Sequence, residues 1–346
     1  MEPFRAGRAI HVSASTYNDV ALHSSTGAAL RSESLWQGLA GVPHQVRYVE
    51  TSLGVRTRII EAGDGPPLLF LHGTGGHLEV FLRNIGFFAD DFHIVAMDLL
   101  GHGYTDLPHD DSLFDWRTVA EHVLSLMDTL GIESAALVGE ALGAQVAQWL
   151  AVQYPARVQR VVLCGACILP TEDADDVSLM ESQAAFQELT ARALEDPGSI
   201  ELMRERMSWL HLKREQVNDE MLDLRVGFWT RPGFTAAHRK LLGSLRTARQ
   251  NPRTSLSRAA LQQLEVPALL VWTEQNPLFG LDSALRLAEY LPTAEVEVFS
   301  DSAMWPQFDE AEKFNELVQS WLSAQHRSDL GVMDPLIDLD DPVHLP

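Results

Sequence analysis

Short apolar runs alternate with longer amphipathic stretches through most of the chain. Runs rich in hydrophobic residues lie at 68–71, 93–97, 135–138, 158–163, 267–272 and 296–299. Such runs are typical of strands buried on both faces of a parallel sheet. Helix-like stretches lie between them, at 78–88, 116–130, after residue 141 and at 282–291, and a last one covers 309–322. Strand and helix alternating at this spacing predict right-handed crossovers and an α/β fold with a mostly parallel sheet.

A hairpin precedes the first of these runs. Two strand-like segments, Val46–Glu50 and Val55–Ile60, flank a turn at Ser52–Gly54. With them the predicted sheet has eight strands and helices on both faces. Ligands of such sheets bind at the carboxyl ends of the strands. We therefore expect one rim to carry four groups of residues, namely His72–Gly73, Asp98, Gly139–Ala141 and Cys167.

The pattern also divides the chain into domains. Between 170 and 258 the strand-like runs stop and charge-rich, helix-forming sequence takes over, which predicts an inserted helical cap. The α/β core then covers 45–169 and 259–325. Residues 1–44 have no sustained period and are expected to be a loosely ordered extension, and the acidic tail at 326–346 is expected to be disordered.

Composition narrows the range of partners. The chain has 346 residues, of which 46% are hydrophobic, and a net charge of -22. A phosphate-binding surface needs the opposite charge, so nucleic acid is excluded as a partner. No apolar run reaches the roughly 18 residues of a membrane span, and the N-terminus lacks the pattern of a signal peptide. The sequence therefore predicts a cytoplasmic protein that does not enter a membrane.

The only cysteines are Cys164 and Cys167, in a C-x-x-C spacing. Redox pairs with this spacing usually open a helix, whereas these residues follow a strand. No second pair exists to complete a zinc site. We interpret them as small buried apolar residues.

The segment Leu137–Gly143 has the frame of the G-x-S-x-G motif without its serine. In that motif the central residue lies on a sharp turn between a strand and a helix, at the top of the sheet. Gly139 and Gly143 retain the small residues that the turn requires, but Ala141 stands at the centre. A methyl group cannot attack a carbonyl carbon, so no acyl-enzyme can form through this position.

Six motifs along the chain carry a resemblance to a known superfamily, by their residues and by their order. They are His72–Gly76, Met97–Gly103, the segment around Ala141, Val271–Glu274, Met304–Phe308 and, in the predicted cap, Asp219–Arg225. Over about residues 46–325 the chain resembles the α/β-hydrolase fold superfamily, and within it the meta-cleavage-product hydrolases. Those enzymes cut carbon–carbon bonds in dienoate acids from the degradation of aromatic rings. The homodimer that is common in that family is an expectation here.

The resemblance implies that all three catalytic positions are substituted. Ala141 stands in place of the serine, Asn276 in place of the aspartate and Met304 in place of the histidine. Ordinary serine hydrolysis should be absent, because a triad works as a unit. The backbone amides of Leu142 and of Gly73 or Thr74 would form the oxyanion site, unless these residues simply retain the geometry of the turn.

Other residues could still bind or transform a ligand. By resemblance Arg225 would bind the substrate carboxylate; alternatively it is a solvated arginine paired with Asp223 or Glu220. Trp229 and Trp305 are expected to contact the substrate, and Met304 to line an apolar wall with Trp305. The histidines His72 and His102 fit turn geometry and loop packing better than proton transfer.

Glu140 differs in kind from the residues found at its position in relatives. A carboxyl group buried near a substrate would have a raised pKa and could act as a general acid or base. Alternatively, it pairs with a neighbouring cation and holds the turn. Glu274 lies close enough in sequence to Asn276 to replace the missing carboxylate, but Met304 leaves it no imidazole to orient.

Three functions remain open. The first is a non-covalent enzyme, such as a lyase, isomerase, decarboxylase or cyclase, acting on a small aromatic or dienoate carboxylate. The second is an inactive relative that binds a ligand or a partner protein. The third is hydrolysis in which Glu140 activates water, alone or with His102. The glycines at 72–76 and 139–143 lack the spacing of a dinucleotide site, and we expect no metal and no cofactor.

Overall fold

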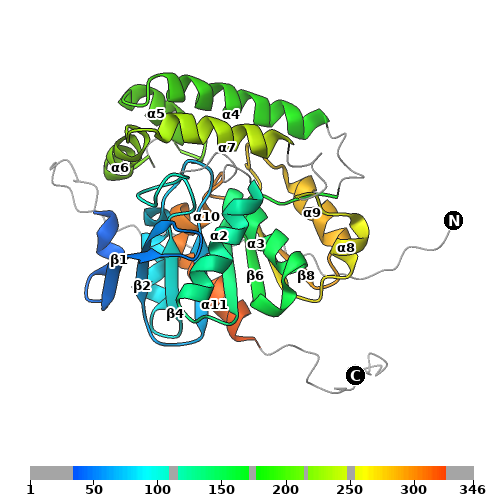
Figure 1. The fold of residues 1–346 in the computed structure, drawn as a ribbon. Helices are drawn as coiled ribbons and strands as arrows, with labels where there is room; N and C mark the ends of the chain where they lie inside the picture. Colours follow the sequence, from blue (N-terminus) through cyan, green and yellow to red (C-terminus); the bar gives the residue numbers. More distant parts are fainter. Residues whose placement is uncertain (1–33, 109–115, 171–176, 214–216, 248–253, 325–346) are drawn as a thin grey trace, which may run out of the picture.

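A computed structural model describes residues 34–108, 116–170, 177–213, 217–247 and 254–324. Most of the predicted extension and the predicted acidic tail lie outside the described residues. The described chain builds one eight-stranded sheet in the order β1-β2-β4-β3-β5-β6-β7-β8 (Figure 1). β1 and β2 form the predicted antiparallel hairpin, β2 pairs with β4 antiparallel, and the remaining pairs are parallel. The predicted fold class is thus confirmed.

The central strands β3, β5 and β7 of the parallel part are short and almost completely buried, as their apolar runs predict. All six residues of β5 and all six of β7 are buried. The strand bounds are β1 His44–Glu50, β2 Arg56–Ala62, β3 Pro67–Leu71, β4 His93–Met97, β5 Ala135–Glu140, β6 Val158–Cys164, β7 Ala268–Thr273 and β8 Ala294–Phe299.

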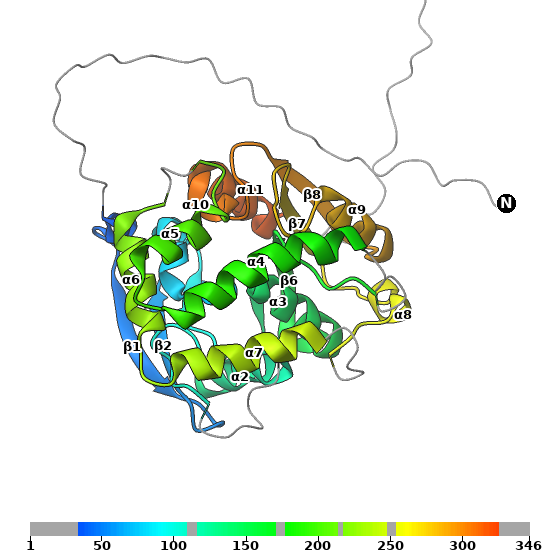
Figure 2. The same cartoon turned by 90° about the horizontal axis from the view of Figure 1, so that it is seen from above.

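Helices cover both faces of the sheet. Seen from above, α2 and α3 lie on one side of the strands and α11 on the other (Figure 2). The helices of the core are η2 Leu78–Phe81, α1 Leu82–Phe88, α2 Trp116–Thr129, α3 Leu142–Gln153, η4 Pro155–Arg157, α8 Arg258–Gln262, α9 Leu281–Tyr290, α10 Pro306–Asp309 and α11 Ala311–Ser323. Among the described residues no helix has both the length and the apolar character that a bilayer crossing requires.

Four helices form a layer above the carboxyl ends of the parallel strands (Figure 1). They all fall within the segment predicted as a cap: α4 Val177–Glu195, α5 Ile200–Ser208, α6 Asp219–Trp229 and α7 Phe234–Thr247. Side chains capping the N-termini of α5 and α6 mark where these helices begin. Ser199 accepts a hydrogen bond from Leu202 N–H, and Asn218 accepts one from Met221 N–H.

One part of the predicted extension belongs to the folded body. Residues Leu35–Leu39 form a 3₁₀ helix, η1, whose Leu35 and Leu39 side chains are buried. The Leu35 N–H donates a 2.7 Å hydrogen bond to Oε2 of Glu220 on α6. Residues 35–39 are therefore part of the fold although they precede residue 45, and the hydrogen bond between Leu35 and Glu220 joins η1 to the cap.

Candidate functional site

The turn between β5 and α3 has the geometry that the G-x-S-x-G frame predicts. Ala141 has φ 49° and ψ -109°, and it is the only residue other than glycine with positive φ in the described part of the chain. A side chain held in such a region costs roughly 1–3 kcal/mol, and such strain clusters at functional sites. The molecule thus keeps a strained turn whose central residue has no reactive group.

Close backbone contacts explain the two glycines of the turn. A Cβ atom on Gly139 would lie 2.3 Å from the backbone of Gly143, and one on Gly143 would lie 1.9 Å from the carbonyl oxygen of Leu71 in β3. Both distances are far below van der Waals contact. Only glycine therefore allows α3 to start so close to β3 and β5.

The residues at the positions expected for the other two triad members meet beside Gly165. Asn276 follows β7 and donates a 2.8 Å hydrogen bond to the carbonyl of Gly165, while its Oδ1 accepts from the N–H groups of Leu278 and Phe279. Met304 follows β8 and is fully buried. A Cβ atom on Gly165 would lie 3.3 Å from Asn276 Nδ2 and 3.8 Å from Met304 Cε. Glu274 is exposed and is not among the residues that line the cavity.

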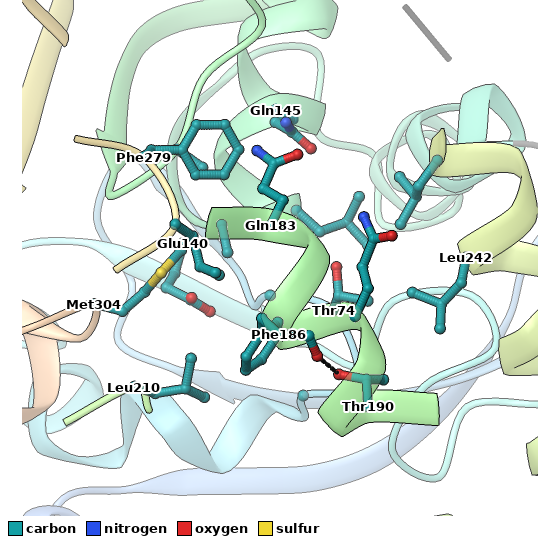
Figure 3. Close-up of a pocket in the computed structure, with 18 of the residues that line it drawn as sticks. Thr74, Glu140, Gln145, Gln183, Phe186, Thr190, Leu210, Leu242, Phe279 and Met304 are labelled. Carbon is teal, nitrogen blue, oxygen red and sulfur yellow. Dashed lines mark hydrogen bonds between the residues drawn. The ribbon is translucent and has the colours of Figure 1, made fainter. Parts of the chain in front are cut away.

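A cavity of about 720 Å³ lies between the cap and the rim of the sheet. Figure 3 shows Glu140, Met304 and Leu210 on one side of it and Leu242 on the other. The predicted site residues that line the cavity are Gly73, Thr74, Glu140, Ala141, Leu142, Arg225, Met304 and Trp305. Asn276 and Trp229 are not among the lining residues.

Glu140 is buried at the edge of this cavity. Its Oε1 accepts a 3.2 Å hydrogen bond from Trp305 Nε1, and Oε2 would be 2.4 Å from a Cβ atom on Gly73, so the carboxylate rests against this glycine. Burial raises the pKa of Glu140 to about 7, although a backbone hydrogen bond from Gly73, the charge of Arg225 and the Trp305 bond oppose the rise. The backbone of Gly73, one of the predicted oxyanion donors, thus lies directly against the Glu140 carboxylate.

Arg225 on α6 is buried and faces the same cavity. Its Nε and Nη2 have no hydrogen-bond partner among the described residues, and its Cζ lies 5.6 Å from the ring centre of Trp305. Glu220 bonds to the N–H of Leu35 instead, and Asp223 is exposed. Burial lowers the pKa of Arg225 to about 10, with the charge of Glu140 opposing the change.

A second buried arginine, Arg206 on α5, was not predicted from the sequence. Nε donates to Thr190 Oγ1 at 3.1 Å and Nη2 to the Thr74 carbonyl at 3.3 Å, whereas Nη1 has no partner among the described residues. The guanidinium lies 4.8 Å from the ring centre of Phe186 and 4.9 Å from that of Trp229. Burial, and then the charge of Arg225, lower the pKa of Arg206 to about 9.

Trp229 has a different position from the one expected. Its ring is fully buried, and Nε1 donates a 3.1 Å hydrogen bond to the carbonyl of Gly75. The ring also packs on Phe234 and His238. Trp229 thus holds the loop after β3 against the cap and is outside the cavity that the ligand would fill.

The two rim histidines have contacts that fit loop packing. In His72, Nδ1 contacts the Gly73 carbonyl at 2.8 Å and Nε2 accepts from the Leu99 N–H at 3.0 Å. Nδ1 of His102 contacts the carbonyl of Leu100. Burial lowers the pKa of His72 well below its usual value and that of His102 to about 4, so both are neutral at pH 7.

The cysteines are both free and buried, in agreement with their interpretation as apolar residues. Burial raises the pKa of the Cys164 thiol well above its usual value. Cys167 lines the cavity. Within the described residues, no three side chains of His, Cys, Asp or Glu are grouped in a way that could hold a metal ion.

Fold and turn geometry together define the class of protein. The family model for the alpha/beta hydrolase fold matches residues 66–311, and the chain belongs to this family. A curated relative, 2-hydroxymuconate semialdehyde hydrolase of Pseudomonas putida, is 30% identical over 274 residues, which are 78% of this chain and 92% of the relative.

Solved structures of meta-cleavage product hydrolases are also similar. One is a serine-to-alanine mutant of the enzyme from Pseudomonas fluorescens IP01, complexed with acetates; it is 25% identical, covers 82% of this chain and 98% of its own, and has a TM-score of 0.66. Another is 2-hydroxy-6-oxo-6-phenylhexa-2,4-dienoate hydrolase from Rhodococcus sp. strain RHA1. It is 23% identical, covers 82% of this chain and 100% of its own, and has a TM-score of 0.69. At 23% identity, the similarity to the Rhodococcus structure shows a shared fold and no more.

Proposed function

We propose that the chain binds a small aromatic or dienoate carboxylate in the cavity and transforms it without a covalent intermediate. The observation that carries the proposal is the guanidinium of Arg225, which lines the cavity together with Glu140 and has donors without partners among the described residues. Such a buried cation favours an anionic ligand, and a guanidinium binds a carboxylate through two parallel hydrogen bonds. The names of the relatives, which include dienoate hydrolases, support the same ligand class.

Glu140 is the residue that would transfer protons. Its ionised form would take a proton from the carbon next to a carbonyl group, and returning that proton to another carbon would complete an isomerisation. The backbone amides of Leu142 and Thr74 would stabilise the enolate oxygen that forms in between. In a lyase this enolate would expel a leaving group from the β-carbon, and in a cyclase it would attack an electrophilic carbon of the same molecule. In a decarboxylase the enolate would form instead as CO₂ leaves, and protonated Glu140 would then give its proton to the carbon.

A ligand-binding protein without catalysis is the second candidate. The observation in its favour is that both carboxylate oxygens of Glu140 already have neighbours, the indole of Trp305 and the Gly73 backbone. In the third candidate, hydrolysis by water that Glu140 activates, oxygen from the solvent would enter the product. Turnover in ¹⁸O-labelled water without label in the product would rule that candidate out.

Binding is tested by thermal unfolding with a panel of aromatic and dienoate carboxylates. A ligand at about a hundred times its Kd adds roughly 2.7 kcal/mol, which raises the midpoint by several degrees. Arg225→Ala should abolish this rise. Arg204→Ala is the control, because Arg204 is on the surface of α5 and pairs with Asp219. The proposal fails if no carboxylate stabilises the wild type, or if Arg225→Ala responds as the wild type does.

Catalysis is tested with a carboxylate that binds. Glu140→Gln keeps the shape of the side chain and removes its ability to exchange protons, so product formation should stop while the Kd changes by less than about threefold. Product formation that continues in this variant would assign Glu140 a structural role. Binding without any product in the wild type would favour the second candidate.

A further inference from the structure

The buried charges at the cavity do not balance. Three charge-bearing side chains that line it are nearly completely buried, namely Glu140, Arg206 and Arg225. One carboxyl group therefore faces two guanidinium groups. Removing a charge from water costs several kcal/mol unless a partner of opposite charge and hydrogen bonds compensate for it.

Each guanidinium has donors left over. Nε and Nη2 of Arg225 and Nη1 of Arg206 are buried and have no hydrogen-bond partner among the described residues. Buried polar groups are nearly always hydrogen-bonded, so unpaired donors on side chains that line a cavity point to a ligand that supplies acceptors.

The two arginines have different surroundings. Arg225 lies over Trp305, whose indole bonds to Glu140. Arg206 lies between Phe186 of α4 and Trp229, and Thr190 and Thr74 accept its hydrogen bonds. Arg206 on α5 and Arg225 on α6 are thus held by different helices and lie against different aromatic rings.

We propose that Arg206 binds a second carboxylate, so that the ligand of this site is a small dicarboxylic acid with one acid group at Arg225 and the other at Arg206. This inference rests on the proposed function, which it narrows. An apolar bridge between the two acid groups suits the cavity, because Leu210, Met304 and Phe186 also line it. A volume of about 720 Å³ lies within the range of roughly 300–1,000 Å³ that is usual for small-molecule sites.

The test compares two acids with the same carbon skeleton. Sorbate (hexa-2,4-dienoate) and trans,trans-muconate (hexa-2,4-dienedioate) differ in one terminal group, a methyl in the first and a carboxylate in the second. Calorimetric titration of the wild type should give a Kd for muconate at least about tenfold lower than for sorbate. In Arg206→Met this preference should disappear, while the Kd for sorbate changes by less than about threefold.

Two further variants make the result specific. Arg206→Lys keeps a positive charge and should retain part of the preference for muconate, which also guards against loss of folding in Arg206→Met. Arg204→Met, on the surface of the same helix, should behave as the wild type does.

The outcomes separate this inference from the proposed function. If sorbate and muconate bind the wild type equally, or if Arg206→Met weakens both to the same extent, the second carboxylate position is refuted and the proposed function stands. If neither acid nor any other carboxylate of the panel binds, both proposals fail together.

Discussion

At the scale of single residues, Glu140 shows how enclosure changes the chemistry of a carboxyl group. The residue ends a strand whose six residues are all buried, and the Gly73 loop and Trp305 close over its side chain. Because the ionised form has lost most of its hydration there, the pKa rises to about 7. The same enclosure affects the stability of the fold.

Glu140 should make folding less stable as the pH rises. Its folded pKa of about 7 lies above the value of 4.5 for a free side chain, so between these values the folded state holds a proton that the unfolded state has lost. Ionisation of the unfolded chain over this range therefore lowers the free energy of unfolding, by about 3 kcal/mol in total, and the loss stops once the folded state ionises as well. Glu140→Gln lacks this contribution, so urea unfolding should show a stability gain over the wild type that is larger at pH 8 than at pH 5.

The exposed Glu188 on α4 supplies the control. Glu188→Gln should differ from the wild type by the same amount at both pH values. A gain for Glu140→Gln that does not change with pH would show that this carboxyl group is not enclosed as described.

The triad positions that the resemblance implies, Ala141, Asn276 and Met304, allow a second prediction. Ala141→Ser alone should not hydrolyse p-nitrophenyl acetate above background, because no imidazole is present to take the proton of the hydroxyl. Adding Asn276→Asp and Met304→His should raise the rate at least about a hundredfold over the single variant. The control combines Asn276→Asp and Met304→His with Ala141 retained, and it should stay inactive. Equal rates in the single and the triple variant would contradict the assignment of these positions.

What the sequence could predict differs between Arg225 and Arg206. Arg225 lies in a segment that resembles a known motif, and its placement at the cavity could be predicted. Nothing local distinguishes Arg206 from Arg204, which is two positions away on the same helix and pairs with Asp219 at the surface. Arg206 is buried by the packing of α5 against α4, α6 and the Gly75 loop, and the sequence pattern does not show that packing. For the same reason, the sequence pattern does not show that the Trp229 ring packs against the loop after β3 and not toward the cavity.

At the scale of elements, the central strands β3, β5 and β7 were predictable because each is short, apolar and bounded by turn residues. Burial on both faces leaves little choice of residue in β3, β5 and β7, so the pattern is strong. The sequence also predicted that the segment around α4–α7 is helical. It did not predict which side chains of these helices face the core or the cavity. The 3₁₀ helix η1 was missed because its five residues are too few to show a period.

The start of α3 depends on a glycine that touches another strand. In Gly143→Ala, the new Cβ atom would lie 1.9 Å from the Leu71 carbonyl, so β3 and α3 would have to separate. We expect a loss of more than about 4 kcal/mol in the free energy of unfolding, or no folded protein at all. Gly227 of α6 is the matched control, since a Cβ atom there meets nothing within 4 Å. Gly227→Ala should stabilise the protein by about 0.5–1 kcal/mol, and equal effects of the two changes in urea unfolding would contradict this account of the turn.

At the scale of the whole molecule, contacts between cap and core determine the cavity. Trp229 bonds to Gly75, Arg206 to Thr74, and the N–H of Met304 to the carbonyl of Leu210. The His211 ring of the cap region also pairs with Asp309 of α10, at 2.7 Å between Nδ1 and Oδ1. Because these bonds join the cap to loops that follow β3 and β8, movement of the cap would change the walls on both sides of the ligand.

The net charge acts on the molecule as a whole. With 48 acidic and 26 basic side chains the protein carries -22 at pH 7, and repulsion between these charges opposes the compact state. Salt screens exposed charges beyond about 10 Å at 0.1 M but hardly affects buried pairs such as Arg58 with Glu79 and Asp98. Raising the ionic strength should therefore relieve the repulsion and leave the buried network intact.

The thermal unfolding midpoint should accordingly rise with salt at pH 8, by several degrees between about 10 mM and 300 mM NaCl. At pH 5, close to the isoelectric point of about 4.9, the same change in salt should have almost no effect, because little net charge remains to be screened. This comparison separates screening from any preferential action of the salt on apolar surfaces, which would appear at both pH values. An equal rise at pH 5 and pH 8 would therefore show that net charge does not limit the stability of this fold.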